Sequence, residues 1–173
     1  SHDVGRDVEV STVIKEARRL GVGLAMVGMH PQAATGREQV VNLWLRPPEE
    51  AQSVEDALAK SNMNLGILLA FRLARAWDAH LNLMCVVGAE ADTAAAQTYV
   101  GELRDLCRIP AKAQTVVVVG QLMEAMAEAP QSDMDVLGVP KTGDELDFMR
   151  RAIKASRSSC IFTQDSGRES ALV

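Results

Sequence analysis

The residues of this chain best suited to chemistry lie in a glycine-containing loop, Gly138-Val139-Pro140-Lys141-Thr142-Gly143, between an apolar run and a helical pattern. A tight glycine turn in that place can present backbone N–H groups to a phosphate, and a lysine can add positive charge. Pro140 removes one N–H donor, however, and no Gly-Ser or Gly-Thr pair follows on the helix. Gly138, Lys141 and Gly143 are therefore weak candidates for binding a nucleotide, and we expect no bound cofactor.

Other catalytic or metal-binding signals are sparse. His30 precedes Pro31 at a predicted strand end, but no Cys, Ser or acidic residue lies near it in sequence, which favours a structural role. Asp133 and Asp135 flank the start of another predicted strand, where a solvated strand entrance is favoured over a metal site. The three cysteines match no metal-binding spacing, and their apolar surroundings predict buried free thiols (Cys85, Cys107 and Cys160).

Composition excludes several classes of protein. The net charge of -5 argues against nucleic-acid binding, which needs cationic side chains for the phosphates. No apolar run approaches the roughly 20 residues of a membrane-spanning helix, so we expect no direct membrane insertion. The sequence begins Ser1-His2-Asp3 rather than with Met, which indicates a cloning remnant or a piece of a longer protein.

The elements that must position these residues follow a helix-then-strand rhythm. Apolar periodicity predicts helices over 7–20, 64–77, 92–108, 122–128 and 144–157, and strands over 24–29, 40–45, 81–87, 115–119, 134–139 and 160–164. Several strands are continuous apolar runs, which is typical of parallel strands covered on both faces. We therefore predict an α/β fold with three layers, in which helices cover both faces of a mostly parallel sheet.

The rhythm becomes regular only after residue 61. Residues 47–61 are charged and polar, which predicts an exposed connection with a helical turn over 54–59. Residues 1–61 are then the end of a preceding half-domain or a set of N-terminal strands, and residues 62–173 form the α/β domain. One compact domain overall is the alternative. The tail over 165–173 is polar and should be ordered only if it docks.

The predicted helix Asn64–Trp77 is apolar around most of its circumference. Only Arg72, Arg75 and Asp78 interrupt the apolar surface, which is much wider than the stripe of about 100° that faces one core. Either this helix is central in the domain, or its second face meets a partner. For the second case the interface candidates are Leu68, Phe71, Arg75 and Trp77.

Short segments in a fixed order suggest a family. They include Gly36-Arg37 leading into Val41-Asn42-Leu43-Trp44-Leu45-Arg46, then Asn64-Leu65-Gly66-Ile67-Leu68-Leu69-Ala70, Ala127-Glu128-Ala129-Pro130-Gln131-Ser132-Asp133, Leu146-Asp147-Phe148-Met149-Arg150 and Ser159-Cys160-Ile161-Phe162. The ordered set covers nearly the whole chain. It resembles the cytoplasmic C-terminal domain of prokaryotic cation-chloride cotransporters, of the Na-K-Cl cotransporter type.

This resemblance implies a Rossmann-like fold similar to universal stress proteins, attached after the membrane-spanning part of a transporter. It further implies a location on the cytoplasmic side of the cell membrane, a homodimer, contact with the transmembrane domain of the same polypeptide, and a regulatory rather than enzymatic role. Family members bind adenine nucleotide through a first half that is mostly absent here, so no nucleotide or ion ligand carries over.

Two alternatives stay open on the sequence alone. The first is a free-standing protein of the universal stress type that binds a nucleotide. The second is an enzyme whose site is assembled from strand ends around His30, Lys141 and Asp165.

Overall fold

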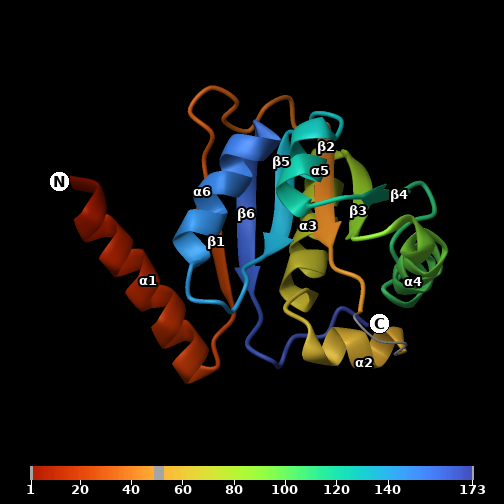
Figure 1. Cartoon of the computed structure of the whole chain (residues 1–173), viewed down its shortest axis with the longest axis horizontal. Coiled ribbons are helices and arrows are strands. Elements are labelled where there is room, and N and C mark those ends of the chain that lie inside the picture. Colours follow the sequence, from red (N-terminus) through yellow and green to blue (C-terminus); the bar gives the residue numbers. More distant parts are fainter. Residues whose placement is uncertain (1, 49–52, 173) are drawn as a thin grey trace.

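The computed structural model describes residues 2–48 and 53–172 and contains one six-stranded sheet (Figure 1). The strands are β1 (Leu24–Gly28), β2 (Val40–Leu45), β3 (His80–Val87), β4 (Gln114–Val119), β5 (Met134–Gly138) and β6 (Ser159–Gln164). The helices are α1 (His2–Leu20), α2 (Val54–Lys60), α3 (Asn64–Trp77), α4 (Thr93–Leu106), α5 (Leu122–Glu128) and α6 (Glu145–Ser156), with a short 3₁₀ turn η1 (Glu90–Asp92). The predicted bounds of α3, α5 and β2 match, and most others shift by one or two residues.

The strands lie in the order β1-β6-β5-β2-β3-β4. All neighbouring pairs are parallel except β1 and β6, which are antiparallel. The amino ends of the five parallel strands therefore share one edge of the sheet, which we call the amino edge, and their carboxyl ends share the opposite carboxyl edge. Since β2 lies between β5 and β3, residues 40–45 are in the centre of the same sheet as the strands that follow residue 61.

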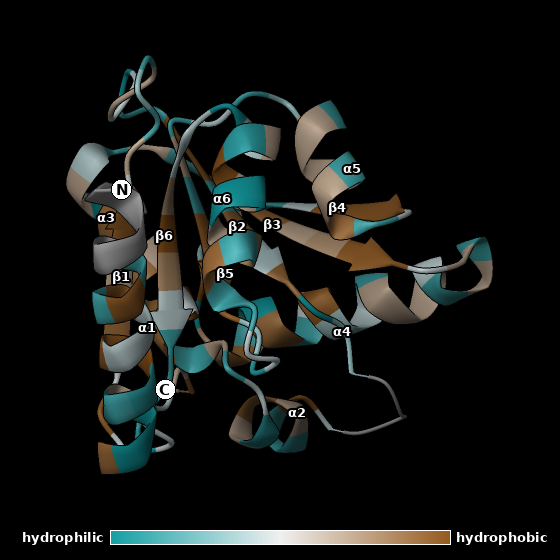
Figure 2. Ribbon diagram, turned by 60° about the vertical axis from the view of Figure 1, so that its left-hand side comes forward, coloured by the Kyte–Doolittle hydropathy of each residue, from teal (hydrophilic) through white to brown (hydrophobic). Residues whose placement is uncertain are grey.

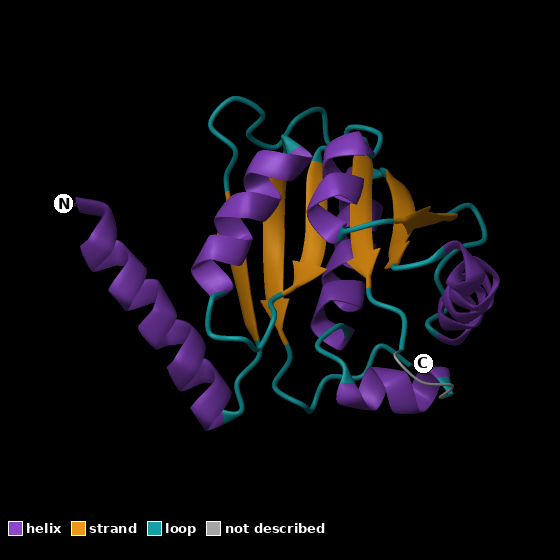
Figure 3. Ribbon diagram, viewed as in Figure 1, coloured by secondary structure: helices purple, strands orange, loops and turns teal. Residues whose placement is uncertain are grey.

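Helices cover both faces of the sheet, so the predicted three-layer α/β fold is confirmed (Figure 3). Side chains of α2, α3 and α4 form one apolar core with alternate residues of β2, β3 and β5. Side chains of α5 and α6 form a second core with the other residues of these strands and with β6. Hydrophilic bands on α6 mark the side turned away from the sheet (Figure 2).

The segment over 47–61, which was predicted to be an exposed connection, differs most from the prediction. Within its described part, residues 47–48 and 53–61, the helix α2 begins at Val54 with Ser53 as its N-cap, whose hydroxyl accepts a 3.1 Å hydrogen bond from Asp56 N. Val54, Ala57 and Leu58 are buried in the core shared with α3 and α4. The sequence predicted only a helical turn over 54–59 here. Three of the helix's four apolar residues face the core, which makes it a short amphipathic helix.

The helix α1 extends from the body of the fold and is attached mainly through its second half (Figure 1). Ile14 and Ala17 are buried, and Arg18 Nη2 donates 3.0 Å hydrogen bonds to Glu145 Oε1 and to Gln164 Oε1. Glu145 is itself buried, so this ion pair ties the end of α1 to the start of α6. Among the described residues, no helix is long and apolar enough to cross a bilayer.

A buried carboxylate joins three strands beneath α5 and α6. Asp135 is 1 % exposed, accepts a 2.6 Å hydrogen bond from Trp44 Nε1 and one of 2.7 Å from Ser132 Oγ, and is also bound by the Ser158 hydroxyl. Burial raises the pKa of Asp135, and the hydrogen bonds from Ser158, Ser132 and Trp44 oppose that shift only in part. The solvated strand entrance predicted for Asp135 is therefore wrong: the side chain is a buried acceptor.

Asp135→Asn should leave stability at neutral pH equal to wild type or higher. An amide can still accept from the Trp44 indole and can donate to Ser132 and Ser158, and it removes a buried charge. Because the pKa of Asp135 is raised in the folded state, its stabilising effect is complete below the unfolded value of about 4 and is lost as pH rises through the folded value. Urea denaturation between pH 4 and 8 should show wild type losing stability relative to Asp135→Asn.

The matched variant is Asp135→Leu, which keeps the side chain's size but removes the acceptor. It leaves the Trp44 N–H without a partner and should cost about 1–3 kcal/mol relative to Asp135→Asn at every pH. Equal stability of Asp135→Asn and Asp135→Leu would contradict this account of the network.

Candidate functional site

The carboxyl edge is where a fold of this kind usually holds a ligand. From β2 the chain passes through α3, on one face of the sheet, to the neighbouring strand β3. The strand β5 is the neighbour of β2 on its other edge, and the helix α6 that follows β5 covers the opposite face of the sheet. A crevice is expected where neighbouring parallel strands diverge in this way. The candidate loop over 138–143 follows β5 at this edge.

Asn62 fills the space next to that loop. Its Nδ2 donates to Val139 O at 2.8 Å and to Thr163 O at 3.2 Å, and its Oδ1 accepts from Asp165 N at 2.5 Å. The backbone also approaches closely here, since a Cβ on Gly138 would lie 2.6 Å from Asn62 O. The absence of a side chain at Gly138 is therefore needed by the chain's own packing and not by a phosphate.

The rest of the loop offers an anion little. Lys141 and Gly143 are exposed, and Gly143 has a φ of 89°, so its role is that of a turn. The first turn of α6 already carries Glu145 and Asp147, whose negative charges occupy the favourable end of the helix dipole. Lys141 and Gly143 thus border a helix start that repels a phosphate.

Asp165 closes the amino-terminal end of α3. Its carboxylate accepts from Asn64 N at 2.9 Å and from Leu65 N at 3.0 Å, so it satisfies N–H groups that a phosphate would otherwise bind. The tail then turns back over this end of the helix, where Ala171 N donates to Asn64 Oδ1 at 3.0 Å and Ala171 is 1 % exposed. The tail is thus docked at the carboxyl edge.

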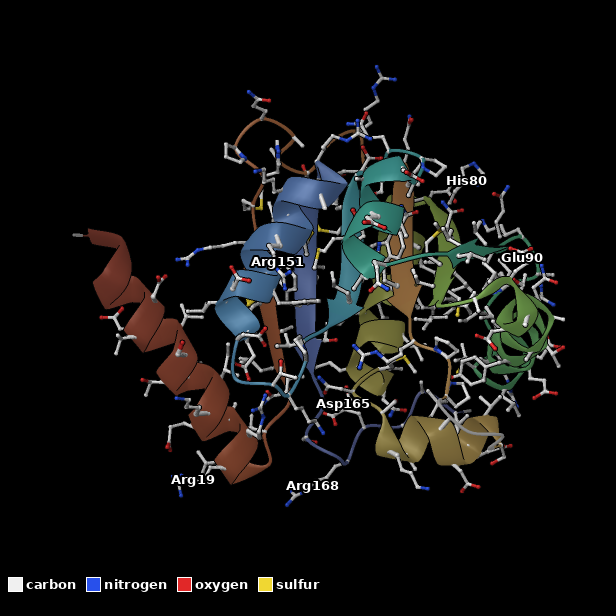
Figure 4. The ribbon with its side chains drawn as sticks, viewed as in Figure 1. Arg19, His80, Glu90, Arg151, Asp165 and Arg168 are labelled. Atoms are coloured by element: carbon white, nitrogen blue, oxygen red, sulfur yellow. The ribbon has the colours of Figure 1, made fainter. Side chains whose placement is uncertain are left out.

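The three residues of the alternative enzyme site are not brought together. Lys141 and Asp165 lie at the carboxyl edge, but β1 is antiparallel to β6, so His30 after β1 lies at the amino edge. The His30 ring serves its own turn, where Nδ1 accepts from Gln32 N at 3.3 Å and from Ala33 N at 3.2 Å. Figure 4 shows the two edges through the labelled His80 and Asp165.

Asp133 also serves the fold. Its carboxylate accepts from Arg37 N at 2.7 Å, Gln39 N at 2.8 Å and Val40 N at 2.9 Å. Partial burial alone would raise its pKa, but these backbone bonds outweigh burial and hold the pKa below its usual range. Within the described ranges no group of His, Cys, Asp and Glu is arranged to hold a metal ion.

The predicted burial of the three thiols is confirmed, and none forms a disulfide. Burial raises the pKa of Cys85 and of Cys107 to about 11 and that of Cys160 to about 12. Thiols held protonated in this way are poor nucleophiles at neutral pH.

The interface candidates on α3 differ in how accessible they are. Ile67, Ala70 and Ala74 are buried, and Leu68 and Trp77 are half-buried because they pack partly against the same core. Phe71 is half-buried and Arg75 is exposed, with the Arg75 guanidinium 5.8 Å from the centre of the Phe71 ring. Much of the wide apolar surface of α3 is therefore used inside the domain, and Phe71 with Arg75 is its accessible part.

A second set of apolar side chains is exposed and was not predicted from the sequence. Large hydrophobic residues exposed to solvent are concentrated between residues 8 and 29: Val8, Val13, Leu20, Val22, Val27 and Met29. Val27 lies on β1, an edge strand with alternating exposure, and Val13 and Leu20 lie on α1. The sequence shows only that these residues are apolar. Their exposure follows from the position of α1 and β1 at the side of the sheet.

The role assigned to Asn62 can be tested by substitution. Asn62→Ala removes two donors to buried carbonyl groups and one acceptor, so it should lower the free energy of unfolding by about 2 kcal/mol in urea denaturation. The control Lys141→Ala, in the same loop system but exposed, should stay within about 0.5 kcal/mol of wild type.

Millimolar MgATP should leave Tm unchanged, because we expect the loop over 138–143 not to bind it. A nucleotide that bound only the folded state would raise Tm. A higher Tm with MgATP that disappears in Lys141→Ala would show that the loop does bind nucleotide.

Comparison with known proteins gives the family. Residues 36–172 match the family model described as "Prokaryotic cation-chloride cotransporter, C-terminal domain, 2nd". No match was found among curated proteins. Among solved structures, the chain is similar to one described as "Crystal structure of the cytoplasmic domain of a prokaryotic cation chloride cotransporter", with a TM-score of 0.84 and 30% sequence identity.

That similarity covers 96% of this chain and 61% of the solved one, so the chain spans about three fifths of the length of its structural relative. The family model covers most of the chain, and the structural match agrees with it in fold. The chain therefore belongs to the family of C-terminal domains of prokaryotic cation-chloride cotransporters.

Proposed function

We propose that this chain is a non-catalytic part of the cytoplasmic domain of a cation-chloride cotransporter. It acts through contact, by forming a homodimer and by touching the membrane part of the same polypeptide. Family membership and the description of the solved relative support the cytoplasmic placement. In this role the domain biases the transporter's conformation through packing, which requires contact surfaces that differ between the states of the transporter.

The observation that carries this proposal is the concentration of exposed apolar side chains between residues 8 and 29. Single exposed apolar residues are common, but a group of them on adjacent elements marks a contact site. These residues precede the family match, which begins at residue 36. We assign them to contact with a preceding part of the longer protein, so that α1 and β1 form the side of the α/β domain that meets that part.

We assign the dimer contact to the accessible part of α3. Phe71 and Arg75 are four residues apart and lie on one face of the helix, with the Arg75 guanidinium 5.8 Å from the centre of the Phe71 ring. Aromatic and arginine side chains are both enriched at protein interfaces. The other two candidates, Leu68 and Trp77, are half-buried against the core, whereas Phe71 and Arg75 provide the side chains that a partner can reach.

Phe71→Asp should convert the dimer of the chain into a monomer without unfolding it. The new carboxylate would have to be desolvated in the contact, and Phe71 is only half-buried in the monomer. Sedimentation velocity at micromolar concentration would give the mass, and circular dichroism would report the fold.

The matched control is Val119→Asp, which places the same charge on an exposed residue at the end of β4, 43 % exposed and away from α3. It should leave the dimer intact. A wild-type chain that sediments as a monomer, or a Phe71→Asp chain that remains a folded dimer, would contradict the assignment to α3.

A further inference from the structure

A hollow of about 380 Å³ lies at the amino edge of the sheet, between the end of α3, the start of β3 and the loop over 110–113. Its volume falls within the range of about 300–1,000 Å³ typical of small-molecule sites. It lies at the opposite edge from the crevice in which folds of this kind usually hold a ligand. None of the candidate nucleotide residues belongs to it.

The floor of the hollow is apolar. It is formed by the Phe71 ring together with Ala74, Ala79, Leu81, Pro110 and Ala113. Ala74, Ala79, Leu81 and Ala113 are buried, so these walls are part of the packed fold and do not depend on surface side chains. Such a floor suits a flat hydrocarbon body that lies against Phe71.

The rim of the hollow is basic. Arg75, His80 and Lys112 line it, and Asp78 is its only carboxylate. In the part of the chain that the structure describes, neither Arg75 nor Lys112 forms an ion pair. This is a concentration of positive charge in a chain whose net charge is -5.

The end of α3 does not use these cations for its own capping. Two of its last carbonyl groups are satisfied by backbone N–H groups, since Ala79 N donates to Ala74 O at 2.8 Å and Asp78 N donates to Arg75 O at 3.3 Å. The Arg75 guanidinium instead lies over Phe71, where a cation–π contact holds it without neutralising its charge. Arg75 and Lys112 therefore remain available to a negatively charged ligand.

We propose that this hollow binds a small organic anion, with its apolar body on the Phe71 floor and its carboxylate, sulfonate or phosphate group between Arg75 and Lys112. The proposal goes beyond the contact function. Because Phe71 and Arg75 also belong to the surface assigned to the dimer, an occupied hollow would alter that surface and give the domain a means of sensing a metabolite.

A second hollow, larger and more open, lies between α5 and α6 and is also lined by cations. Its lining residues are Met123, Ala127, Arg151, Lys154, Ala155 and Arg157. Two of its cations are engaged, because Arg151 Nε pairs with Asp147 at 2.9 Å and Arg157 Nη2 donates to Ala127 O at 3.3 Å. Arg151 lies on α6 in Figure 4, well apart from His80, so the two hollows can be told apart by mapping.

The test is a titration of the ¹⁵N-labelled 173-residue chain with naphthalene-2-sulfonate. Binding is monitored by NMR through the changes in the backbone amide chemical shifts. Saturable shifts should appear at residues 71–81 and 110–113. The neutral analogue naphthalene-2-methanol, which has the same body without the charge, should bind more weakly. Arg75→Gln and Lys112→Gln should each weaken binding of the sulfonate roughly two- to fivefold, the range of exposed charge pairs.

The matched controls are Arg151→Gln and Lys154→Gln, which remove a charge from the second hollow and should leave binding unchanged. Three outcomes would overturn the proposal: shifts that map to α5 and α6, equal binding of the sulfonate and the alcohol, or no saturable shift at millimolar probe. This experiment measures ligand binding, whereas sedimentation measures mass. The proposal for the hollow can therefore be contradicted while the proposed dimer is confirmed, and the reverse.

Discussion

Two polar side chains, Asn62 and Asp165, hold the carboxyl ends of β5 and β6 and the start of α3 together, and the arrangement of the carboxyl edge depends on this closure. Asn62 joins the backbone after β5 to the end of β6, and Asp165 joins the end of β6 to the start of α3. The tail docks on the same helix end through Ala171. The N–H groups of Asn64 and Leu65, which a phosphate could otherwise bind at this helix start, are satisfied within the chain.

The contacts of Asn62, of Asp165 and of the docked tail make the carboxyl edge a structural element. Other surfaces are then the candidates for function. They are the exposed apolar residues of α1 and β1, the accessible Phe71–Arg75 pair on α3, and the basic hollow at the amino edge. We therefore propose contact and coupling as the role of these surfaces.

The sequence predicted most of the fold because its apolar periodicity is strong where the core is. The helix α3 and the strand β2 lie at the centre of the domain, and their bounds were predicted to the residue. The helix α2 was predicted only as a turn over 54–59 in an exposed connection, because its buried residues Val54, Ala57 and Leu58 lie in a mainly polar segment. The antiparallel direction of β1 has no local signal, and it is what separates His30 from Lys141 and Asp165.

The site was harder to predict, for a physical reason. A glycine turn before a helix looks the same in sequence whether a phosphate or the chain's own asparagine fills the space beside it. Asn62 lies 77 residues from Val139 and 101 from Thr163, so only the folded arrangement shows the contact. Similarly, the exposure of Val13 or Val27 depends on where α1 and β1 lie and not on their composition.

If this chain is one part of a larger membrane transporter, the size and the cell fraction of the native polypeptide should show it. An antibody raised against residues 1–173 should detect a protein several times longer than the 18.7 kDa chain, in the membrane fraction and released only by detergent. A soluble product near 19 kDa in the cytosolic fraction would contradict the claim and leave a free-standing protein of the universal stress type as the better account.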